Sequence, residues 1–248
     1  MIILKSDREI DYMRDAGRIV ANTHAELAQA VKPGVTTQEL DRIAEDYITK
    51  AGAKPAFKGY NGFPATICAS LNEQVVHGIP GLRKLENGDI ISIDVGAVIN
   101  GYFGDAAATL PVGMITEDAQ RLLDITQQSL FVGIDQAVVD NRLYDISSSI
   151  QTFVESNGFS VVRDYVGHGI GRNMHEDPQV PNFGKPGRGT RLQAGMTLAI
   201  EPMVNMGVHE VKTNSDNWTV VTRDGKLSAH FEHTIAITDA GPEILTQV

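Results

Sequence analysis

The 248-residue sequence predicts an α+β protein built from two similar halves. In each half of the chain, two stretches with helical spacing are followed by short β-branched runs. The second helix of each half aligns at an offset of 106 residues, which places Glu39 on Asp145 and Gly52 on Gly158. We therefore expect one domain over residues 1–248, with halves of about 1–112 and 113–248 and a cleft at their junction, where ligand sites are common.

The first half opens with two helices that carry their own start and stop signals. Ser6 and Glu9 have the spacing of a capping box, and Lys32-Pro33-Gly34 ends the helix that follows. Thr36 and Glu39 repeat this spacing, and the second helix ends at Gly52. Glycine-broken β-branched runs then predict strands over residues 63–112.

The second half repeats this order of elements. Helical spacing returns at about residues 117–135 and again at 144–157, and strand-like runs continue from there to the end of the chain.

Composition excludes several classes of protein. The single cysteine, Cys68, rules out an intrachain disulfide and a cysteine zinc cluster, and it fits a reducing compartment. The net charge of −10, without clustered Lys or Arg, argues against nucleic-acid binding. No apolar run approaches a membrane span, and Asp7 interrupts any signal-peptide core. We expect a cytoplasmic protein with neither a membrane nor a nucleic acid as its partner.

Residues 90–105 are the most informative stretch. Asn100-Gly101 between two β-like runs is a strong signal for a tight hairpin, and this turn would place Gly96 opposite Asp105. Asp94 would then lie on the same face as Asp105, as its diagonal neighbour. Two such carboxylates repel unless a cation lies between them. The alternative is one exposed Asp and one Asp at the hairpin rim, without a shared role.

Three further residues extend this acidic set. Glycines frame His168, and His175 follows seven residues later; the alternative is that both histidines are structural. Glu201 ends an apolar strand before Pro202, and Glu232 is expected inside the strand 229–235. A structural base could neutralise either Glu, but bases are scarce nearby. Two Asp, two Glu and one His suit hard or borderline divalent metals, and four carboxylates favour a pair of ions.

These residues and their flanking motifs resemble the methionine aminopeptidases of the bacterial type I class. The five candidate ligands match in type, order and approximate spacing; they are Asp94, Asp105, His168, Glu201 and Glu232. The flanking runs match too: Gly-His-Gly-Ile-Gly at His168, Ile-Glu-Pro at Glu201, Glu-His-Thr at Glu232, and Asn72-Glu73-x-Val-Val-His77-Gly-Ile-Pro. The resemblance covers nearly the whole chain, to about residue 240.

The resemblance implies the pita-bread (creatinase/aminopeptidase) fold, a pseudo-twofold αβ repeat with a curved antiparallel sheet and the helices outside. It implies two divalent ions, drawn from Mn, Fe, Co or Zn. Asp94 would chelate one ion and His168 and Glu201 would hold the other, with Asp105 and Glu232 as bridges.

The resemblance also implies roles in catalysis and substrate binding. Glu201 would carry the proton from water to the leaving amine, His175 would lie near the carbonyl oxygen and His77 near the scissile nitrogen. The pocket for methionine would be lined by Tyr60, Phe63, Cys68, His77, Met174, His175 and Trp218. A monovalent-cation site would use Asn72, Gln74 and Ser228.

Two positions depart from the family pattern. Many members carry Thr where this chain has Gly96, and an aromatic residue where it has Met174. The first change removes a hydroxyl beside the predicted metals, and the second changes the shape of the predicted pocket.

The resulting hypothesis is a metal-dependent aminopeptidase that removes the initiator methionine from nascent proteins when the second residue is small. We expect a monomer that acts on nascent N-termini, at the ribosome. The enzymatic alternative is a proline-directed peptidase, prolidase or aminopeptidase P, although these carry an extra N-terminal domain for which we expect no room before residue 7. The other alternative is a non-catalytic binding module, which would typically have lost metal ligands.

Overall fold

The computed structural model describes residues 1–247. Its helices are α1 (Asp7–Ala30), α2 (Thr37–Lys50), α3 (Glu117–Ile134) and α4 (Leu143–Ser156), with a short 3₁₀ helix at Tyr60–Gly62. The strands of the first half are β1 (Lys54–Pro55), β2 (Ile67–Leu71), β3 (Gln74–Val76), β4 (Ile90–Ile99) and β5 (Tyr102–Pro111). Those of the second half are β6 (Ser160–Val161), β7 (Gly167–Gly169), β8 (Glu176–Val180), β9 (Thr197–Ile200), β10 (Met203–Asn205), β11 (Val211–Thr213), β12 (Val220–Thr222), β13 (Ser228–His230), β14 (His233–Thr238) and β15 (Gly241–Ile244).

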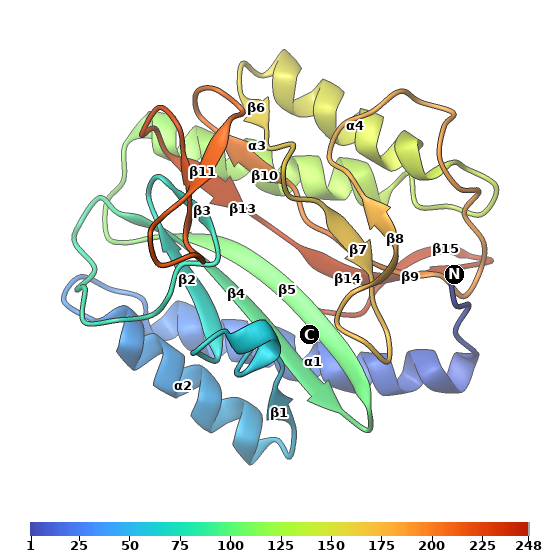
Figure 1. Cartoon of the computed structure of the whole chain (residues 1–248), viewed down its shortest axis with the longest axis horizontal. Coiled ribbons are helices and arrows are strands. Elements are labelled where there is room, and N and C mark those ends of the chain that lie inside the picture. The colour runs from blue at the N-terminus through green and yellow to red at the C-terminus, as the bar shows by residue number, and fades with distance from the viewer. Residues whose placement is uncertain (248) are drawn as a thin grey trace.

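The helices form two pairs on opposite sides of the strands. Figure 1 shows α1 and α2 below the central strands and α3 and α4 above them. The predicted capping boxes are present: the Glu9 carboxylate accepts from the Ser6 amide at 3.0 Å, and the Glu39 carboxylate accepts from the Thr36 amide at 2.8 Å. Both helices thus begin where the sequence predicts, because one carboxylate satisfies a free backbone donor at each start.

The repeat predicted from the sequence is visible in the second helix of each pair. Helices α2 and α4 both have 14 residues, and their starts differ by the predicted 106 positions. Gly52 and Gly158 follow them with φ of 80° and 82°, a left-handed conformation that glycine adopts without strain. The matching helix pairs support the pseudo-twofold αβ repeat.

The strands form four antiparallel groups. Strand β4 pairs with β1, β2 and β5, while a second sheet has the order β15-β14-β9-β7-β8. Two smaller sheets have the orders β13-β10-β6 and β11-β12-β3. The last of these joins residues 74–76 of the first half to strands of the second.

The β4–β5 hairpin has the register predicted from its turn. Asn100 and Gly101 both have positive φ, and Ile99 pairs with Tyr102. Gly96 lies opposite Asp105, as predicted. The register therefore places both aspartates on one face of the hairpin.

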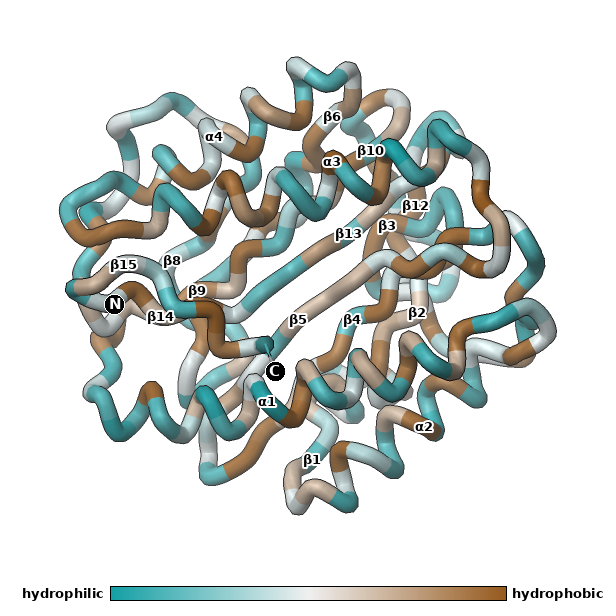
Figure 2. Tube along the Cα trace, turned by 180° about the vertical axis from the view of Figure 1, so that it is seen from behind, coloured by the Kyte–Doolittle hydropathy of each residue, from teal (hydrophilic) through white to brown (hydrophobic). Residues whose placement is uncertain are grey.

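The apolar faces of the helices pack on the strands. Along α1, α2 and α3, hydrophobic residues alternate with hydrophilic ones in the helical period (Figure 2). One buried cluster lies between α1, α2 and the β4–β5 hairpin, and another lies beneath α3 and α4. The second cluster also contains Ile90 of β4, so the two halves share core residues.

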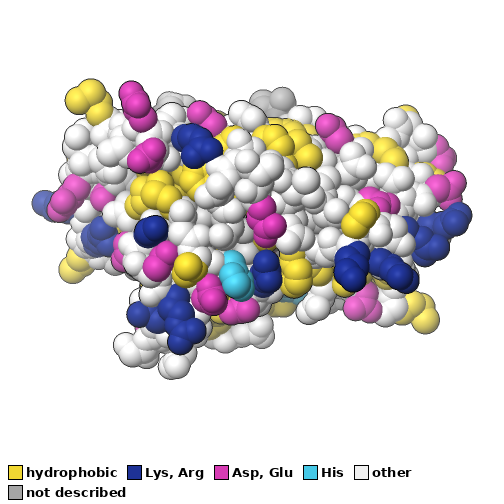
Figure 3. All heavy atoms as spheres, turned by 90° about the horizontal axis from the view of Figure 1, so that it is seen from above, with side chains coloured by type: hydrophobic (Ala, Val, Ile, Leu, Met, Phe, Trp, Pro, Cys, Tyr) yellow, Lys and Arg dark blue, Asp and Glu magenta, His cyan; other side chains and the backbone are white. Residues whose placement is uncertain are grey.

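The surface mixes charges of both signs. Figure 3 shows basic and acidic side chains interspersed on one face of the molecule, with small apolar patches between them. None of the helices within residues 1–247 has the length and apolar composition needed to cross a membrane.

Candidate active site

The β4–β5 hairpin supplies two of the predicted metal ligands. Asp94 and Asp105 lie on its inner face, and each has one buried carboxylate oxygen without a hydrogen-bond partner. Burial raises the pKa of Asp94 to about 7 and the pKa of Asp105 well above its ordinary value of 3.8. The neighbouring charge of Glu232 adds to the rise at Asp105.

His168 faces this pair from β7. Its Nδ1 donates to the Gly169 carbonyl oxygen at 2.8 Å, so Nε2 carries a free lone pair. That Nε2 lies 3.8 Å from Asp105 Oδ2 and 3.5 Å from Glu201 Oε1. Burial lowers the pKa of His168 to about 4, which keeps the ring neutral. A neutral imidazole with its lone pair toward carboxylates is a typical metal ligand.

Glu201 follows β9 directly, as predicted, and Pro202 comes after it. Asn182 is fully buried and donates from Nδ2 to the Glu201 carbonyl oxygen at 3.0 Å, which fixes the backbone there. Burial raises the pKa of Glu201 well above 4.5, and the charges of Asp105 and Asp94 raise it further.

The position of Glu232 corrects one prediction. It does not lie inside a strand, because β13 ends at His230 and β14 begins at His233. At this break the chain leaves the sheet of β10 and joins that of β9. The Glu232 amide donates to the Ala107 carbonyl oxygen at 2.9 Å, which holds the residue beside the hairpin. The break brings its side chain into the acidic set.

The four carboxylates and His168 fit a metal site. Side-chain atoms of Asp105, His168 and Glu232 lie within 4.8 Å of one another. Asp94, Asp105 and Glu232 each keep a buried oxygen without a partner, and within residues 1–247 no Lys or Arg forms an ion pair with any of the four acids. Buried carboxylates of this kind stay ionised only with a compensating cation, and without one they take up protons.

The acids form the floor of a cavity of about 270 Å³. Six of the seven residues predicted to bind substrate line it: Tyr60, Phe63, Cys68, His77, His175 and Trp218. The Phe63 and Trp218 rings meet edge to face with centroids 5.1 Å apart, which makes one wall aromatic. Burial and the neighbouring acids raise the pKa of the Cys68 thiol, so this side chain is a neutral apolar surface.

The two predicted catalytic histidines both line this cavity. His175 Nδ1 is 2.8 Å from the Tyr60 hydroxyl, and its ring centroid is 4.2 Å from that of His168. His77 contacts Trp218 and Tyr165 edge to face. Burial lowers the pKa of His77 to about 4 and that of His175 below 6.5, so both rings are neutral at neutral pH.

The structure does not bring Met174 into the cavity. Its side chain is buried in a separate cluster with Ile10, Met13 and Tyr102, because the chain turns it away from the face on which His175 lies. Two other residues, Phe57 and Asn61, line the cavity although the sequence analysis missed them. His230 is a further residue beside the site that no motif indicated, and its Nε2 lies 3.8 Å from Glu201 Oε2.

The predicted monovalent-cation residues lie close together outside the cavity. Ser228 donates its amide to the Asn72 carbonyl oxygen at 2.9 Å. The Asn72 side chain bonds Asp89 and the Ile90 amide, and Gln74 accepts from the Leu71 amide. The Ser228 hydroxyl donates to Asn205 Oδ1.

Comparisons with known proteins agree with this site. The model of metallopeptidase family M24 matches residues 11–239. The methionine aminopeptidase of Clostridium perfringens is 63% identical over the full length of both chains, and methionine aminopeptidase 1 of Bacillus subtilis is 61% identical over the same extent. The crystal structure of methionine aminopeptidase from Thermotoga maritima superposes with a TM-score of 0.99 at 48% identity, covering all of both chains.

The prolidase of Pyrococcus horikoshii shares the fold alone. It is 23% identical with a TM-score of 0.82, and this chain covers 64% of it. The pita-bread fold is therefore common to both groups, whereas high identity over full length is found with the methionine aminopeptidases. The chain belongs to metallopeptidase family M24 and, within it, to the methionine aminopeptidases.

Proposed function

We propose that this chain hydrolyses the N-terminal methionine from polypeptides whose second residue is small. The observation that carries the proposal is a cavity with two contrasting surfaces. Its floor is a cluster of buried carboxylates with His168, and its wall is formed by Phe63, Trp218 and Cys68. A hydrolytic centre beside an apolar pocket fits a peptidase that selects an apolar terminal side chain.

Divalent metal use follows from the family and from the buried acidic group. We assign two ions, drawn from Mn, Fe, Co or Zn. Asp94 would hold one, His168 and Glu201 the other, and Asp105 and Glu232 both. When bound, such ions polarise a carbonyl oxygen and increase the acidity of water.

Glu201 is assigned as the general base and acid. Asn182 fixes its backbone, and the surrounding acids keep the affinity of its carboxylate for a proton high. With cations bound, the Glu201 carboxylate would be ionised at neutral pH, where it could take a proton from water and return it to the leaving amine.

His175 is assigned to the carbonyl oxygen of the scissile bond. When the Tyr60 hydroxyl donates to Nδ1, the hydrogen of the neutral ring is on Nε2. That N–H can donate to the oxygen as negative charge develops on it. His77 is neutral by the same effect of burial, and we assign it to the scissile nitrogen.

The apolar wall explains the choice of methionine. Aromatic edges favour a thioether by about 0.3–1.5 kcal/mol, and an unbranched side chain fits a narrow slot better than a γ-branched one. We assign Tyr60, Phe63, Cys68, His77, His175 and Trp218 to this pocket. Met174 supports the backbone next to His175 from the core.

The remaining assignments concern the whole protein. We propose that residues 1–248 form one catalytic domain of two pseudo-symmetric halves, acting as a cytoplasmic monomer on nascent polypeptides at the ribosome. A monovalent cation bound by Asn72, Gln74 and Ser228 is part of the same proposal; the hydrogen bond from the Ser228 amide to the Asn72 carbonyl oxygen brings two of these residues together.

Initial rates on four peptides test the proposal: Met-Ala-Ser, Leu-Ala-Ser, Met-Lys-Ser and an X-Pro peptide. We expect rapid cleavage of Met-Ala-Ser and slow cleavage of the others. Comparable rates on Leu-Ala-Ser would indicate a broad aminopeptidase, and preference for X-Pro would indicate a proline-directed one. Metal analysis of protein purified without added metal, in parallel, should find two divalent ions per chain.

A further inference from the structure

The segment before α1 reaches the loop that carries His175. Lys5 Nζ lies 2.5 Å from Glu176 Oε2, and the two side chains are only 3% and 6% exposed. The same ammonium donates to the Ile3 carbonyl oxygen at 3.1 Å. Glu176 follows His175 directly, so this buried ion pair joins the N-terminal segment to the backbone beside a proposed catalytic group.

Both partners of the pair have further anchors. The Lys5 amide donates to the Gly195 carbonyl oxygen at 2.7 Å, which ties the segment to the turn before β9. Glu176 Oε1 accepts from the Asn173 amide at 3.1 Å, which closes the loop on itself. Gly171 packs against the pair so closely that a Cβ there would lie 2.4 Å from Lys5 Cε.

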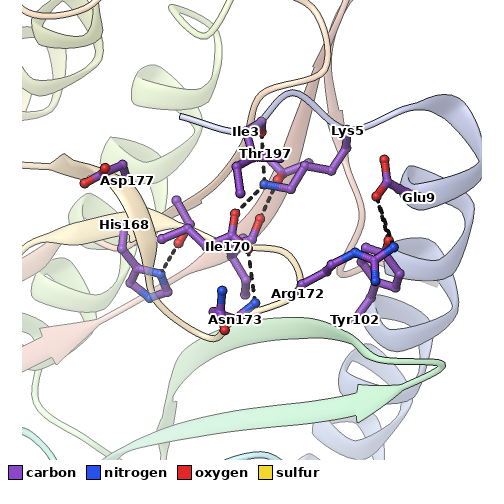
Figure 4. Close-up of polar contacts among 12 residues, drawn as sticks. Ile3, Lys5, Glu9, Tyr102, His168, Ile170, Arg172, Asn173, Asp177 and Thr197 are labelled. Atoms are coloured by element: carbon purple, nitrogen blue, oxygen red, sulfur yellow. Dashed lines mark hydrogen bonds and ion pairs between the residues drawn. The ribbon is translucent and has the colours of Figure 1, made fainter. Parts of the chain in front are cut away.

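The start of the loop is held separately. Figure 4 shows Arg172 directed toward Tyr102, with Tyr102 in turn hydrogen-bonded to Glu9 of α1. The Arg172 guanidinium lies 4.9 Å from the centre of the Tyr102 ring. The Phe103 amide donates to the Gly171 carbonyl oxygen at 2.9 Å. The end of the loop, at His175, is held where Glu176 pairs with Gly169 at the start of β8 and where its side chain meets Lys5.

The His175 ring contacts two other rings, those of Tyr60 and His168, whose centroids lie 5.4 and 4.2 Å away. The His175 side chain is exposed, and its polar partner is the Tyr60 hydroxyl, which is also exposed. The position of the ring against these neighbours also depends on where the backbone of residues 174–176 is held. Met174 on one side is buried in the core; on the other side Glu176 pairs with Gly169 through its backbone and with Lys5 through its side chain.

We propose that Lys5 and Glu176 are positioning residues, and that their buried ion pair holds His175 where its ring meets the substrate carbonyl. The inference rests on the proposed function, in which His175 donates to that oxygen. Removing one partner of a buried pair leaves the other charge without compensation, so the loop would rearrange to solvate it. A displacement of about 1 Å at a reacting group can cost about a hundredfold in rate.

Lys5→Met is the direct test, because it keeps the length of the side chain and removes its charge. We expect kcat on Met-Ala-Ser to fall by about tenfold or more while KM changes by less than about threefold. Metal content should match that of the wild type. In a His175→Ala background the same change should have almost no further effect on kcat, since the group it positions is gone.

Two further variants keep the test decisive. Arg14→Met is the matched control: it removes a partly buried ion pair of α1 with Glu243, at 2.6 Å, with no contact to the loop. It should lower stability with kcat unchanged. Glu176→Gln keeps the shape of its side chain and should lower kcat even if Lys5→Met does not fold.

The inference is overturned if Lys5→Met and Glu176→Gln lower kcat no more than Arg14→Met does. It is also overturned if Lys5→Met lowers kcat by the same factor with and without His175. A wild-type protein without activity on Met-Ala-Ser would instead overturn the proposed function, so the two failures are distinguishable.

Discussion

Two histidines seven residues apart acquire different chemistry from their surroundings. His168 is buried, and its Nδ1–H donates to a backbone carbonyl, so that a lone pair faces the acids. His175 is exposed and contacts a tyrosine hydroxyl that can donate to Nδ1, which leaves a hydrogen on Nε2. The first arrangement suits metal ligation, and the second suits donation to an oxyanion.

Alanine substitution should separate these two roles. His175→Ala should lower kcat by about a hundredfold or more, because one oxyanion donor is lost, while metal content stays unchanged. His168→Ala should instead lower metal occupancy, since it removes a ligand. Metal analysis and steady-state kinetics on the same preparations check both expectations. The reverse pattern would show that the two roles are exchanged.

Asp105 is the residue on which the two-metal assignment depends most. Asp105→Asn removes a charge next to both proposed ions and should weaken metal binding and abolish turnover. The fold should survive, because Ile91, Ile93 and Val95 hold the hairpin in the core independently of that carboxylate. Circular dichroism and metal titration measure the two effects. Wild-type turnover at limiting metal would exclude Asp105 as a bridging ligand.

The pocket wall shows what sequence alone could predict of the site. Asp94 and Asp105 could be paired because strand alternation and a two-residue turn set their register. The family resemblance implies a pocket position for Met174, yet the chain bends before β8 and the Met174 side chain packs in the core cluster. Phe57 carries no motif, and only the tertiary packing brings it into the cavity.

At the scale of the elements, the local sequence predicted the β4–β5 hairpin but not the end of β13 before Glu232. The β4–β5 hairpin was predictable because its register depends on residues within the hairpin itself. The break at Glu232 was not, because residues 229–235 read as one apolar run. The chain changes sheets there to pair with β9, a partner that the local sequence does not reveal.

Strand β4 also explains the departure at Gly96. A Cβ at this position would lie 2.6 Å from Phe57 Cε1 and 3.0 Å from the Ala56 Cβ. Phe57 lines the cavity, so its ring occupies the space that a threonine at position 96 would need. The glycine and the phenylalanine are thus a complementary pair just beyond β1, where the Ala56 amide donates to the Gly96 carbonyl oxygen at 3.0 Å.

Gly96→Thr should therefore force the Phe57 ring to move. We expect the free energy of unfolding to fall by about 1–3 kcal/mol, as for other overpacked sites, with a raised KM for Met-Ala-Ser. Adding Phe57→Ala should recover part of the stability. Urea unfolding measures the coupling, and Gly81→Thr is the control because nothing lies within 4 Å of a Cβ there. Strictly additive effects of the two changes would contradict the model of a shared space.

At the scale of the whole molecule, the site draws on both halves of the chain. Asp94 and Asp105 come from the first half, whereas His168, Glu201 and Glu232 come from the second. The proposed junction at about residue 112 thus divides the ligands between the two halves, which share core residues. The repeat could be predicted from the 106-residue offset. The proximity of the acids could not be predicted from local signals, because they come from strands that are distant in the sequence.

The concentration of buried acids makes the stability of the metal-free protein depend on pH. Above about pH 7 the histidines are neutral whether the chain is folded or unfolded, since their ordinary pKa is 6.5 and burial lowers it in the fold. The acids are ionised in the unfolded chain, where their pKa values are about 3.8 and 4.5. In the fold the pKa of Asp94 is raised to about 7, and those of Asp105, Glu201 and Glu232 are raised well above their ordinary values.

The folded chain therefore binds more protons than the unfolded one, and its stability should fall as pH rises above about 7. The slope is about 1.4 kcal/mol per pH unit for each carboxyl group still protonated. Urea unfolding of chelator-treated protein measures it, and Glu232→Gln should make the slope shallower because it removes one of the titrating groups. Divalent ions compete with these protons for the carboxylates. The stabilisation of the fold by added metal should therefore increase as pH rises. If the free energy of unfolding of the metal-free protein stays constant or rises with pH, the four acids are not protonated in the fold as we assign them.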